Sequence, residues 1–255
     1  MRLHFQVRGK GFPLIIVHGF LGSLDNWRNA SQRLSDHYAT YRIDLRNHGL
    51  SPHSDAMNYE LMAQDLREFV DLHRLPSSFL LGHSMGGKVA MQFAADWPDR
   101  VAKLAVVDIA PRAYEPYQRP ILNALLALDL TIFKSFAEVE NALSGAIPDI
   151  GVRQFLLKNL TRDNDGGLRW KIPLQAIARN YDDLVVAIQP RQSFDKPTCF
   201  IRGGRSNYIT EKDIPVIQAI FTHAKIETIP EAGHWVHMDA PEAFLRCVMK
   251  FFSDS

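Results

Sequence analysis

The sequence predicts an α/β fold, in which a mostly parallel central sheet is flanked by helices and carries an inserted helical cap. Two observations support this fold class. Short apolar runs alternate with helical segments along most of the chain, which is the pattern of strand–helix–strand units. The alternation stops after Asp108 and resumes at Lys196, and the interval has helical patterns but no strand pattern. We therefore expect a core of residues 1–111 and 191–255, with residues 112–190 as the cap.

The predicted strands are short and continuously apolar, as expected for parallel strands that are buried on both faces. They are residues 14–17, 38–43, 78–81, 104–107, 198–201 and 225–229. A helix is predicted over residues 58–73, where apolar residues recur at the spacing of one helix face. Another helix should open at Pro241, because a proline at the first helical position lacks only an N–H that would have no partner there.

The pentapeptide Gly82-His83-Ser84-Met85-Gly86 follows a predicted strand directly and precedes the helix-forming stretch 88–93. A strand that enters a glycine-flanked serine and then a helix is the arrangement of a nucleophile elbow. The turn is so tight that side chains two residues before and after the serine would collide, so these positions, Gly82 and Gly86, require glycine. We expect Ser84 to have a positive φ, to present its hydroxyl above the sheet and to be the nucleophile.

The predicted strand 14–17 ends in His18-Gly19-Phe20. This turn should bring the backbone N–H of Phe20 beside the elbow, where the N–H of Met85 offers a second donor. Two such donors, aimed at a developing alkoxide, would form an oxyanion hole, and each contributes roughly 10²–10³ in rate. The alternative is an ordinary glycine turn capped by a histidine.

His234 is the predicted general base. It lies between the strand 225–229 and the helix that opens at Pro241, and therefore on a loop at the same sheet edge as Ser84. Four other histidines could approach this region: His18, His48, His83 and His237. Their spacing shows no pair of histidines on one helix face and no cysteine partner, so we predict no metal site.

These residues carry a resemblance to a known family. The order of Ser84 and His234, the His18-Gly19 turn and residues 44–51 together resemble the α/β-hydrolase superfamily. More specific stretches resemble the YbfF-type carboxylesterases of bacteria and their mitochondrial relatives; they are residues 22–26, 46–52, 82–88, 107–111 and 233–237. The resemblance implies the α/β-hydrolase fold and a serine esterase.

The acidic member of the site is predicted at Asp108. The loop after the strand 198–201, which carries the acid in most α/β-hydrolases, contains no carboxylate, whereas the strand 104–107 ends in Asp108. A carboxylate at the mouth of an apolar strand is costly unless it has a partner, and an imidazolium is the natural one. The resemblance to YbfF-type enzymes implies the same position, with Ser206 in the vacated loop as an auxiliary hydrogen-bonding group. The alternatives are a helix N-cap for Asp108 and a plain turn residue for Ser206.

The cap is expected to set the substrate. We predict that Leu21, Ile121, Leu125 and Trp235 bind it. The alternative is packing of the cap on itself for Ile121 and Leu125, and packing in the core for Trp235. Residues 151–180 contain six basic and two acidic residues, which a solvated face explains. Docking of a coenzyme A phosphate or of an acidic carrier protein is the alternative.

Composition narrows the functional classes. The formal net charge of +1 gives no electrostatic footprint for nucleic acid or an anionic membrane surface. No apolar run approaches a membrane span, and the N-terminus has no apolar signal segment. The two cysteines, Cys199 and Cys247, are expected to be buried free thiols, so we expect a cytoplasmic protein.

The predicted function is therefore that of a serine carboxylic-ester hydrolase, acting on small to medium acyl esters through an acyl-enzyme on Ser84, without metal or cofactor. The main alternative is a thioesterase or methyl-esterase acting on acyl-coenzyme A or acyl carrier protein. Haloalkane dehalogenase is disfavoured because the elbow carries serine rather than aspartate. A catalytically silent binding protein is disfavoured because nucleophile and base are both present.

The substitution Asp108→Asn tests the assignment of the acid. We expect turnover to fall by about 10⁴-fold, because an amide at this position favours the wrong imidazole tautomer. Steady-state ester hydrolysis by the purified variant measures the effect. A variant within threefold of the unsubstituted protein would instead point to Glu211 or Asp213.

Overall fold

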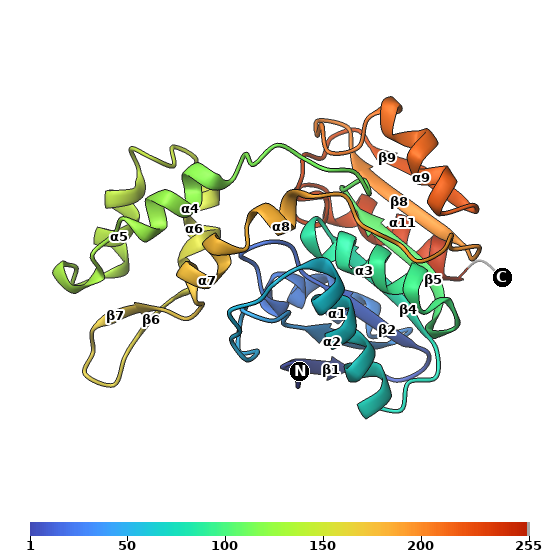
Figure 1. Cartoon of the computed structure of the whole chain (residues 1–255), viewed down its shortest axis with the longest axis horizontal. Coiled ribbons are helices and arrows are strands. Elements are labelled where there is room, and N and C mark those ends of the chain that lie inside the picture. Colours follow the sequence, from blue (N-terminus) through green and yellow to red (C-terminus); the bar gives the residue numbers. More distant parts are fainter. Residues whose placement is uncertain (254–255) are drawn as a thin grey trace.

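The computed structural model describes residues 1–253, and the last two residues of the predicted core, 254 and 255, lie outside the described part. Its centre is a seven-stranded sheet of order β1-β3-β2-β4-β5-β8-β9 (Figure 1). The strands are β1 Phe5–Arg8, β2 Pro13–Val17, β3 Ala39–Ile43, β4 Ser78–His83, β5 Val101–Val107, β8 Thr198–Gly203 and β9 Ala224–Ile229. Neighbouring strands run parallel except for β1 and β3. The predicted fold class is confirmed.

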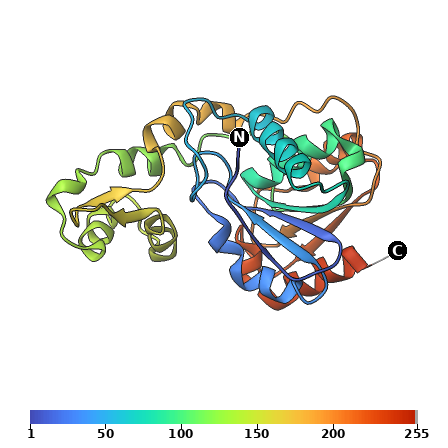
Figure 2. The ribbon, with the colours of Figure 1, turned by 90° about the horizontal axis from the view of Figure 1, so that it is seen from below.

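Helices cover both faces of this sheet (Figure 2). Those outside the β5–β8 connection are η1 Leu24–Trp27, α1 Arg28–Leu34, α2 Tyr59–Leu72, α3 Met85–Asp96, η2 Pro98–Arg100, η4 Glu211–Asp213, α9 Ile214–Ile220, α10 Val236–Asp239 and α11 Pro241–Ser253. Helices α2, α3 and α9 share one buried cluster with Ile15 and Val17, whereas α1 and α11 share another with Leu14 and Ile16. Since successive residues of β2 enter opposite clusters, the strand must be apolar throughout.

The predicted helix boundaries agree closely with the structure. The helix predicted over residues 58–73 is α2, and the side chain of Asn58 caps it by accepting a hydrogen bond from the N–H of Leu61 at 2.8 Å. Pro241 occupies the first position of α11, as predicted. The apolar stripe of α2 thus determined the length of the helix, and the capping residue determined its start.

One core strand was not predicted. β1 is an edge strand that pairs antiparallel with β3, and its four residues are only partly buried or exposed. An edge strand packs on one side only, so its sequence, Phe-Gln-Val-Arg, does not form the continuous apolar run that marks the inner strands.

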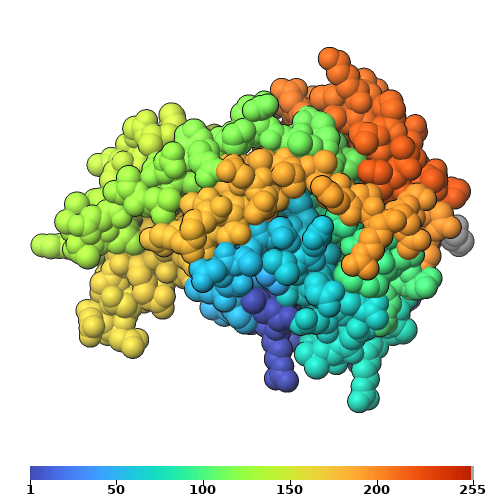
Figure 3. Space-filling view, viewed as in Figure 1, coloured from blue at the N-terminus to red at the C-terminus, as the bar shows by residue number. Residues whose placement is uncertain are grey.

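The segment between β5 and β8 projects from one end of the sheet (Figures 1 and 3). Its elements are α4 Arg119–Leu126, η3 Leu130–Ile132, α5 Phe136–Leu143, α6 Ile150–Leu157, β6 Leu160–Arg162, β7 Leu168–Trp170, α7 Leu174–Arg179 and α8 Asp182–Val185. We propose that residues 112–190 form a cap over the carboxyl edge of the sheet, and we use the name cap for this segment.

The expectation that this interval contains no strand was wrong. β6 and β7 form an antiparallel hairpin in which Leu160 is opposite Trp170. Its turn contains Gly166 at φ 84°, and the side chain of Asp163 accepts hydrogen bonds from the N–H groups of Asp165 and Gly167. Strands of three residues are too short to show an alternating pattern, and only the glycine pair signalled the turn.

Side chains of helix α3 form hydrogen bonds with the segment that leads from the cap back to the core. The ammonium of Lys88, although fully buried, donates to the carbonyl of Val186 at 2.5 Å. The side chain of Gln92 makes two hydrogen bonds, both 2.9 Å long, with the backbone of Gln189. The aromatic rings of Tyr59 and Tyr114 lie 5.3 and 4.8 Å from the Lys88 ammonium, so cation–π contacts partly replace its hydration.

Burial, together with the positive charge of Arg112, lowers the pKa of Lys88 to about 7. In the unfolded chain the amine keeps its proton up to about pH 10.5, so between these values the unfolded state binds more protons. Stability should therefore rise from pH 7 to 9.5 by up to about 1.4 kcal/mol per pH unit. Urea unfolding at several pH values should show this rise in the unsubstituted protein and lose it in Lys88→Met. The same substitution at exposed Lys212 is the control and should retain the rise; identical pH profiles for both variants would contradict the expectation.

Candidate active site

Ser84 lies between β4 and α3, at the carboxyl edge of the sheet. Its backbone has φ 53° and ψ −122°, a conformation that side chains rarely adopt. The flanking glycines are required by contact, because a Cβ at Gly82 would lie 2.2 Å from the carbonyl oxygen of Gly86, and one at Gly86 would lie 2.3 Å from that of His18. The N–H of Ser84 donates to the carbonyl of Val107 at 3.0 Å. The tight turn therefore holds the serine in the strained conformation of a nucleophile elbow.

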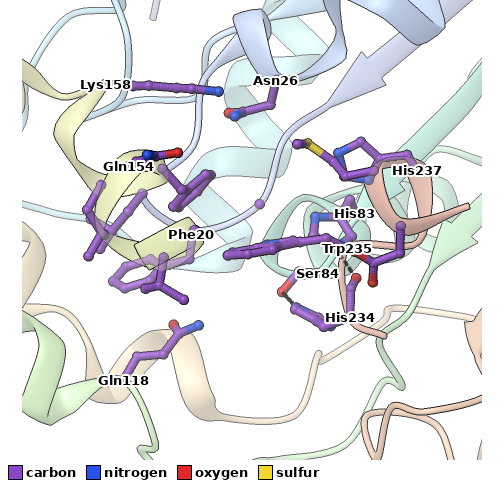
Figure 4. Close-up of a pocket in the computed structure, with 18 of the residues that line it drawn as sticks. Phe20, Asn26, His83, Ser84, Gln118, Gln154, Lys158, His234, Trp235 and His237 are labelled. Carbon is purple, nitrogen blue, oxygen red and sulfur yellow. Dashed lines mark hydrogen bonds between the residues drawn. The ribbon is translucent and has the colours of Figure 1, made fainter. Parts of the chain in front are cut away.

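The imidazole of His234 lies against Ser84, and the two are 150 residues apart in the chain. Its Nε2 is 3.0 Å from the Ser84 hydroxyl oxygen (Figure 4). Tyr208 stacks on the imidazole, with the ring centroids 3.8 Å apart and an interplanar angle of 19°. His83 Nε2 donates to the carbonyl oxygen of His234 at 2.8 Å, and this hydrogen bond helps to hold the loop that carries His234.

Asp108 follows β5 and is completely buried. Its Oδ2 accepts hydrogen bonds from His234 Nδ1 at 2.8 Å and from the hydroxyl of Ser206, and its Oδ1 accepts one from the N–H of Gly203 at 2.9 Å. The buried carboxylate therefore has a donor for each of its oxygens. The bond to Nδ1 fixes the tautomer of His234, so that Nε2 is free to accept the proton of Ser84.

The alternatives for the acid are engaged elsewhere. Asp213 accepts from Arg112 Nε at 2.6 Å, and Glu211 forms an ion pair with Arg202 at 2.7 Å. No helix in the described chain begins at Asp108, since α4 begins at Arg119. The structure thus brings together Ser84, His234, Asp108 and Ser206, all of which the sequence analysis singled out.

The predicted oxyanion donors lie on the two elements that flank the nucleophile. Met85 opens α3, and the first N–H groups of a helix have no partner within the helix. Phe20 follows Gly19, and a Cβ added at Gly19 would lie only 3.3 Å from the Cβ of Ser84, so the two loops approach each other closely. We call residues 18–24 the oxyanion loop. The arrangement is compatible with both backbone N–H groups facing an alkoxide on Ser84.

Two buried histidines shape the oxyanion loop. His18 Nε2 accepts from the N–H of Leu45 at 3.0 Å, and His48 Nε2 accepts from the N–H of Leu21 at 3.1 Å. Burial lowers the pKa of both rings, that of His48 to about 3, so both are neutral acceptors at physiological pH. Their Nδ1 atoms donate to the carbonyls of Gly19 and Arg46.

His237 is also a packing residue. It stacks on Trp27 with the ring centroids 4.2 Å apart, and burial lowers its pKa to about 3. Burial likewise lowers the pKa of His83 well below its usual value. Within residues 1–253 no three side chains of histidine, cysteine, aspartate or glutamate gather as metal ligands. The contacts of His18, His48, His83 and His237 are thus with the loops and the wall of the site.

A cavity of about 440 Å³ opens beside Ser84, between the core and the cap. The predicted substrate residues Leu21, Ile121 and Trp235 line it. Gln118, Val152, Gln154 and Phe155, which the sequence did not single out, line it as well, as do Lys158 and His237; Figure 4 labels Gln118, Gln154, Lys158 and His237. The prediction for Leu125 was wrong. It is 2% exposed and lies on the buried face of α4, where it packs in the hydrophobic core instead of lining the cavity.

Comparison with known proteins identifies the family. A family model described as the alpha/beta hydrolase fold matches residues 13–143. The chain belongs to the α/β-hydrolase family. It is 35% identical to Esterase YbfF of Escherichia coli (strain K12), covering 95% of this chain and 93% of the relative, and 34% identical to the sn-1-specific diacylglycerol lipase ABHD11 of Danio rerio, covering 97% and 80%. A solved structure titled Marine microorganism esterase has 44% identity, covers 98% of both chains and superposes with a TM-score of 0.96. These findings support a hydrolase of the YbfF type.

Among the described residues, none of the helices combines the length and hydropathy needed to span a bilayer.

The substitution Ser206→Ala tests the hydrogen bond to Asp108. The carboxylate would keep His234 and the N–H of Gly203 but lose one donor, and a hydrogen bond to a charged group contributes about 1.5–3 kcal/mol. We expect kcat to fall by roughly tenfold, with little change in KM. Exposed Ser193, replaced by alanine, is the matched control. Unchanged kcat in Ser206→Ala would assign this serine a purely local role in its turn.

Proposed function

We propose that the protein is a serine carboxylic-ester hydrolase that forms an acyl-enzyme on Ser84. The observation that carries the proposal is the hydrogen-bonded chain from Ser84 Oγ through the imidazole of His234 to the buried carboxylate of Asp108, with distances of 3.0 and 2.8 Å. Ser84, at one end of this series of hydrogen bonds, lines a cavity that is large enough for an acyl group. Nucleophile, base and orienting acid in this order are the requirement of acyl transfer.

The first step is acylation. His234 Nε2 takes the proton of the Ser84 hydroxyl as Oγ attacks the ester carbonyl carbon. The carbonyl oxygen becomes an alkoxide, which the backbone N–H groups of Phe20 and Met85 stabilise. His234 then donates the same proton to the alcohol oxygen as the carbon–oxygen bond breaks, which leaves the acyl group on Ser84.

The second step is deacylation. His234 takes a proton from water, whose oxygen attacks the acyl carbon, and the proton passes to Ser84 Oγ as the acid is released. Asp108 holds Nδ1 protonated in both steps and stabilises the charged imidazolium. Ser206 and the N–H of Gly203 keep the carboxylate in place.

The proposed substrates are esters of small to medium acyl groups. Leu21, Ile121 and Trp235 supply apolar wall to the cavity, and the ring of Phe155 packs at a tilt against Trp235, with the centroids 5.4 Å apart. An apolar pocket of this size discriminates weakly between neighbouring chain lengths, so several should be accepted. The esterase and lipase names of the relatives support ester substrates. We further propose a cytoplasmic location, which the free thiols of Cys199 and Cys247 support.

A second candidate is hydrolysis of thioesters on coenzyme A or an acyl carrier protein. The observation that favours it is Lys158, an exposed cation that lines the cavity and points across it towards Asn26 (Figure 4). A lysine at this position could attract a phosphate of the carrier. Butyryl-coenzyme A and p-nitrophenyl butyrate, compared under the same conditions, distinguish the two functions by their kcat/KM values.

The deciding experiment compares p-nitrophenyl butyrate hydrolysis by the unsubstituted protein and Ser84→Ala. We expect the substitution to lower kcat by at least about 10⁴-fold, because no other group can form the acyl-enzyme. Ser193→Ala again serves as the surface control. Equal rates in the unsubstituted protein and Ser84→Ala, on both the ester and the thioester, would refute the proposed function.

A further inference from the structure

Both the backbone N–H and the backbone carbonyl of Leu21, in the oxyanion loop, form hydrogen bonds to side chains. It has φ 55°, a conformation that a branched side chain adopts only when its surroundings impose it. Its N–H donates to His48 Nε2 at 3.1 Å, and its carbonyl accepts from the side-chain amide of Asn159 at 2.8 Å. Because Leu21 directly follows Phe20, these two bonds control the position of the predicted oxyanion donor.

Asn159 belongs to the cap, 138 residues away in the chain. It lies two residues after the end of α6 and is 4% exposed. Its N–H donates to the carbonyl of Leu156 at 3.0 Å, and its own carbonyl accepts from the N–H of Lys171 at 2.7 Å. The side-chain amide is therefore presented from a fixed backbone, so a movement of α6 would be transmitted to Leu21.

Helix α6 is also a wall of the substrate cavity. Val152, Phe155 and Leu156 line the cavity from this helix, and Lys158 lines it from the residue just before Asn159. An acyl chain that fills the cavity thus packs against the same short segment that holds the oxyanion loop. A chain too short to reach α6 lacks this contact.

We propose that Asn159 is a positioning residue that couples filling of the cavity to alignment of the oxyanion loop. The inference rests on the function proposed above. Packing of the acyl chain on α6 stabilises the hydrogen bond from the Asn159 amide to the Leu21 carbonyl, which holds the N–H of Phe20 towards the alkoxide on Ser84. Both acylation and deacylation pass through this alkoxide, so preference for longer acyl chains is expressed in kcat.

The substitution Asn159→Asp is a sharp test, because it keeps the shape of the side chain but replaces the amide donor with a carboxylate that faces a carbonyl. Exposed Asn123 on α4, changed to aspartate, is the control for the added charge on the cap. Asn159→Gln keeps an amide donor and is the rescue variant. The substrates are p-nitrophenyl acetate and p-nitrophenyl octanoate.

We expect kcat of the unsubstituted protein to be higher for octanoate than for acetate. In Asn159→Asp the octanoate kcat should fall by about 10–100-fold, the effect of misplacing a catalytic group by roughly an ångström. The acetate kcat should fall much less, so the octanoate-to-acetate ratio approaches one, while KM changes by less than about threefold. Asn123→Asp should match the unsubstituted protein, and Asn159→Gln should recover part of the ratio.

The ratio of the two kcat values within one preparation does not depend on the folded fraction, so it remains decisive if Asn159→Asp is destabilised. An unchanged ratio, or a loss carried by KM alone, would overturn the coupling and leave Asn159 as a joint between cap and core. Ser84→Ala separates this result from failure of the proposed function. Activity that needs Ser84 but not the Asn159 amide refutes only the coupling, whereas activity that survives in Ser84→Ala refutes the function on which it rests.

Discussion

The buried carboxylate of Asp108 is the interaction on which the organisation of the site depends. It accepts hydrogen bonds from Gly203 at the end of β8, from Ser206 in the loop after β8, and from His234 in the loop after β9. A charge without solvent contact is tolerated only when donors surround it, so the carboxylate holds the ends of three neighbouring strands in one arrangement. Because the same bonds orient the imidazole towards Ser84, the group that stabilises the loops also prepares the proposed base.

The opposite side of the nucleophile is organised by neutral groups. His18 and His48 are buried deeply enough that their pKa values are lowered, and each uses a ring nitrogen to accept a backbone N–H. A charged imidazolium has no acceptor nitrogen, so low pKa values are a condition for the shape of the oxyanion loop. The site thus combines the buried carboxylate of Asp108 on one side of Ser84 with neutral imidazoles on the other.

The cap contributes more than a wall. Its helix α6 lines the substrate cavity, and Asn159, just beyond that helix, reaches the carbonyl of Leu21 in the core. The return of the chain from the cap is fastened by Lys88 and Gln92 of α3, the helix that begins directly after the nucleophile. The cap is therefore tied, at Asn159 in its middle and at its return to the core, to elements that carry the proposed reacting groups, which gives substrate binding a physical route to the proposed chemistry.

The sequence by itself determined the parallel sheet and the elbow at Ser84, because strands buried on both faces require continuous apolar runs and a tight turn requires glycine. It also indicated Asp108 and His234, since polar residues at the ends of parallel strands gather at one edge. Only the tertiary structure decided which cap residues face the cavity: Ile121 does and Leu125 does not, although both are apolar residues of α4. The edge strand β1 and the hydrogen bond from Asn159 to Leu21 also could not be predicted from the local sequence pattern. Both depend on contacts between distant segments, and such contacts leave no periodic signal in the residues that make them.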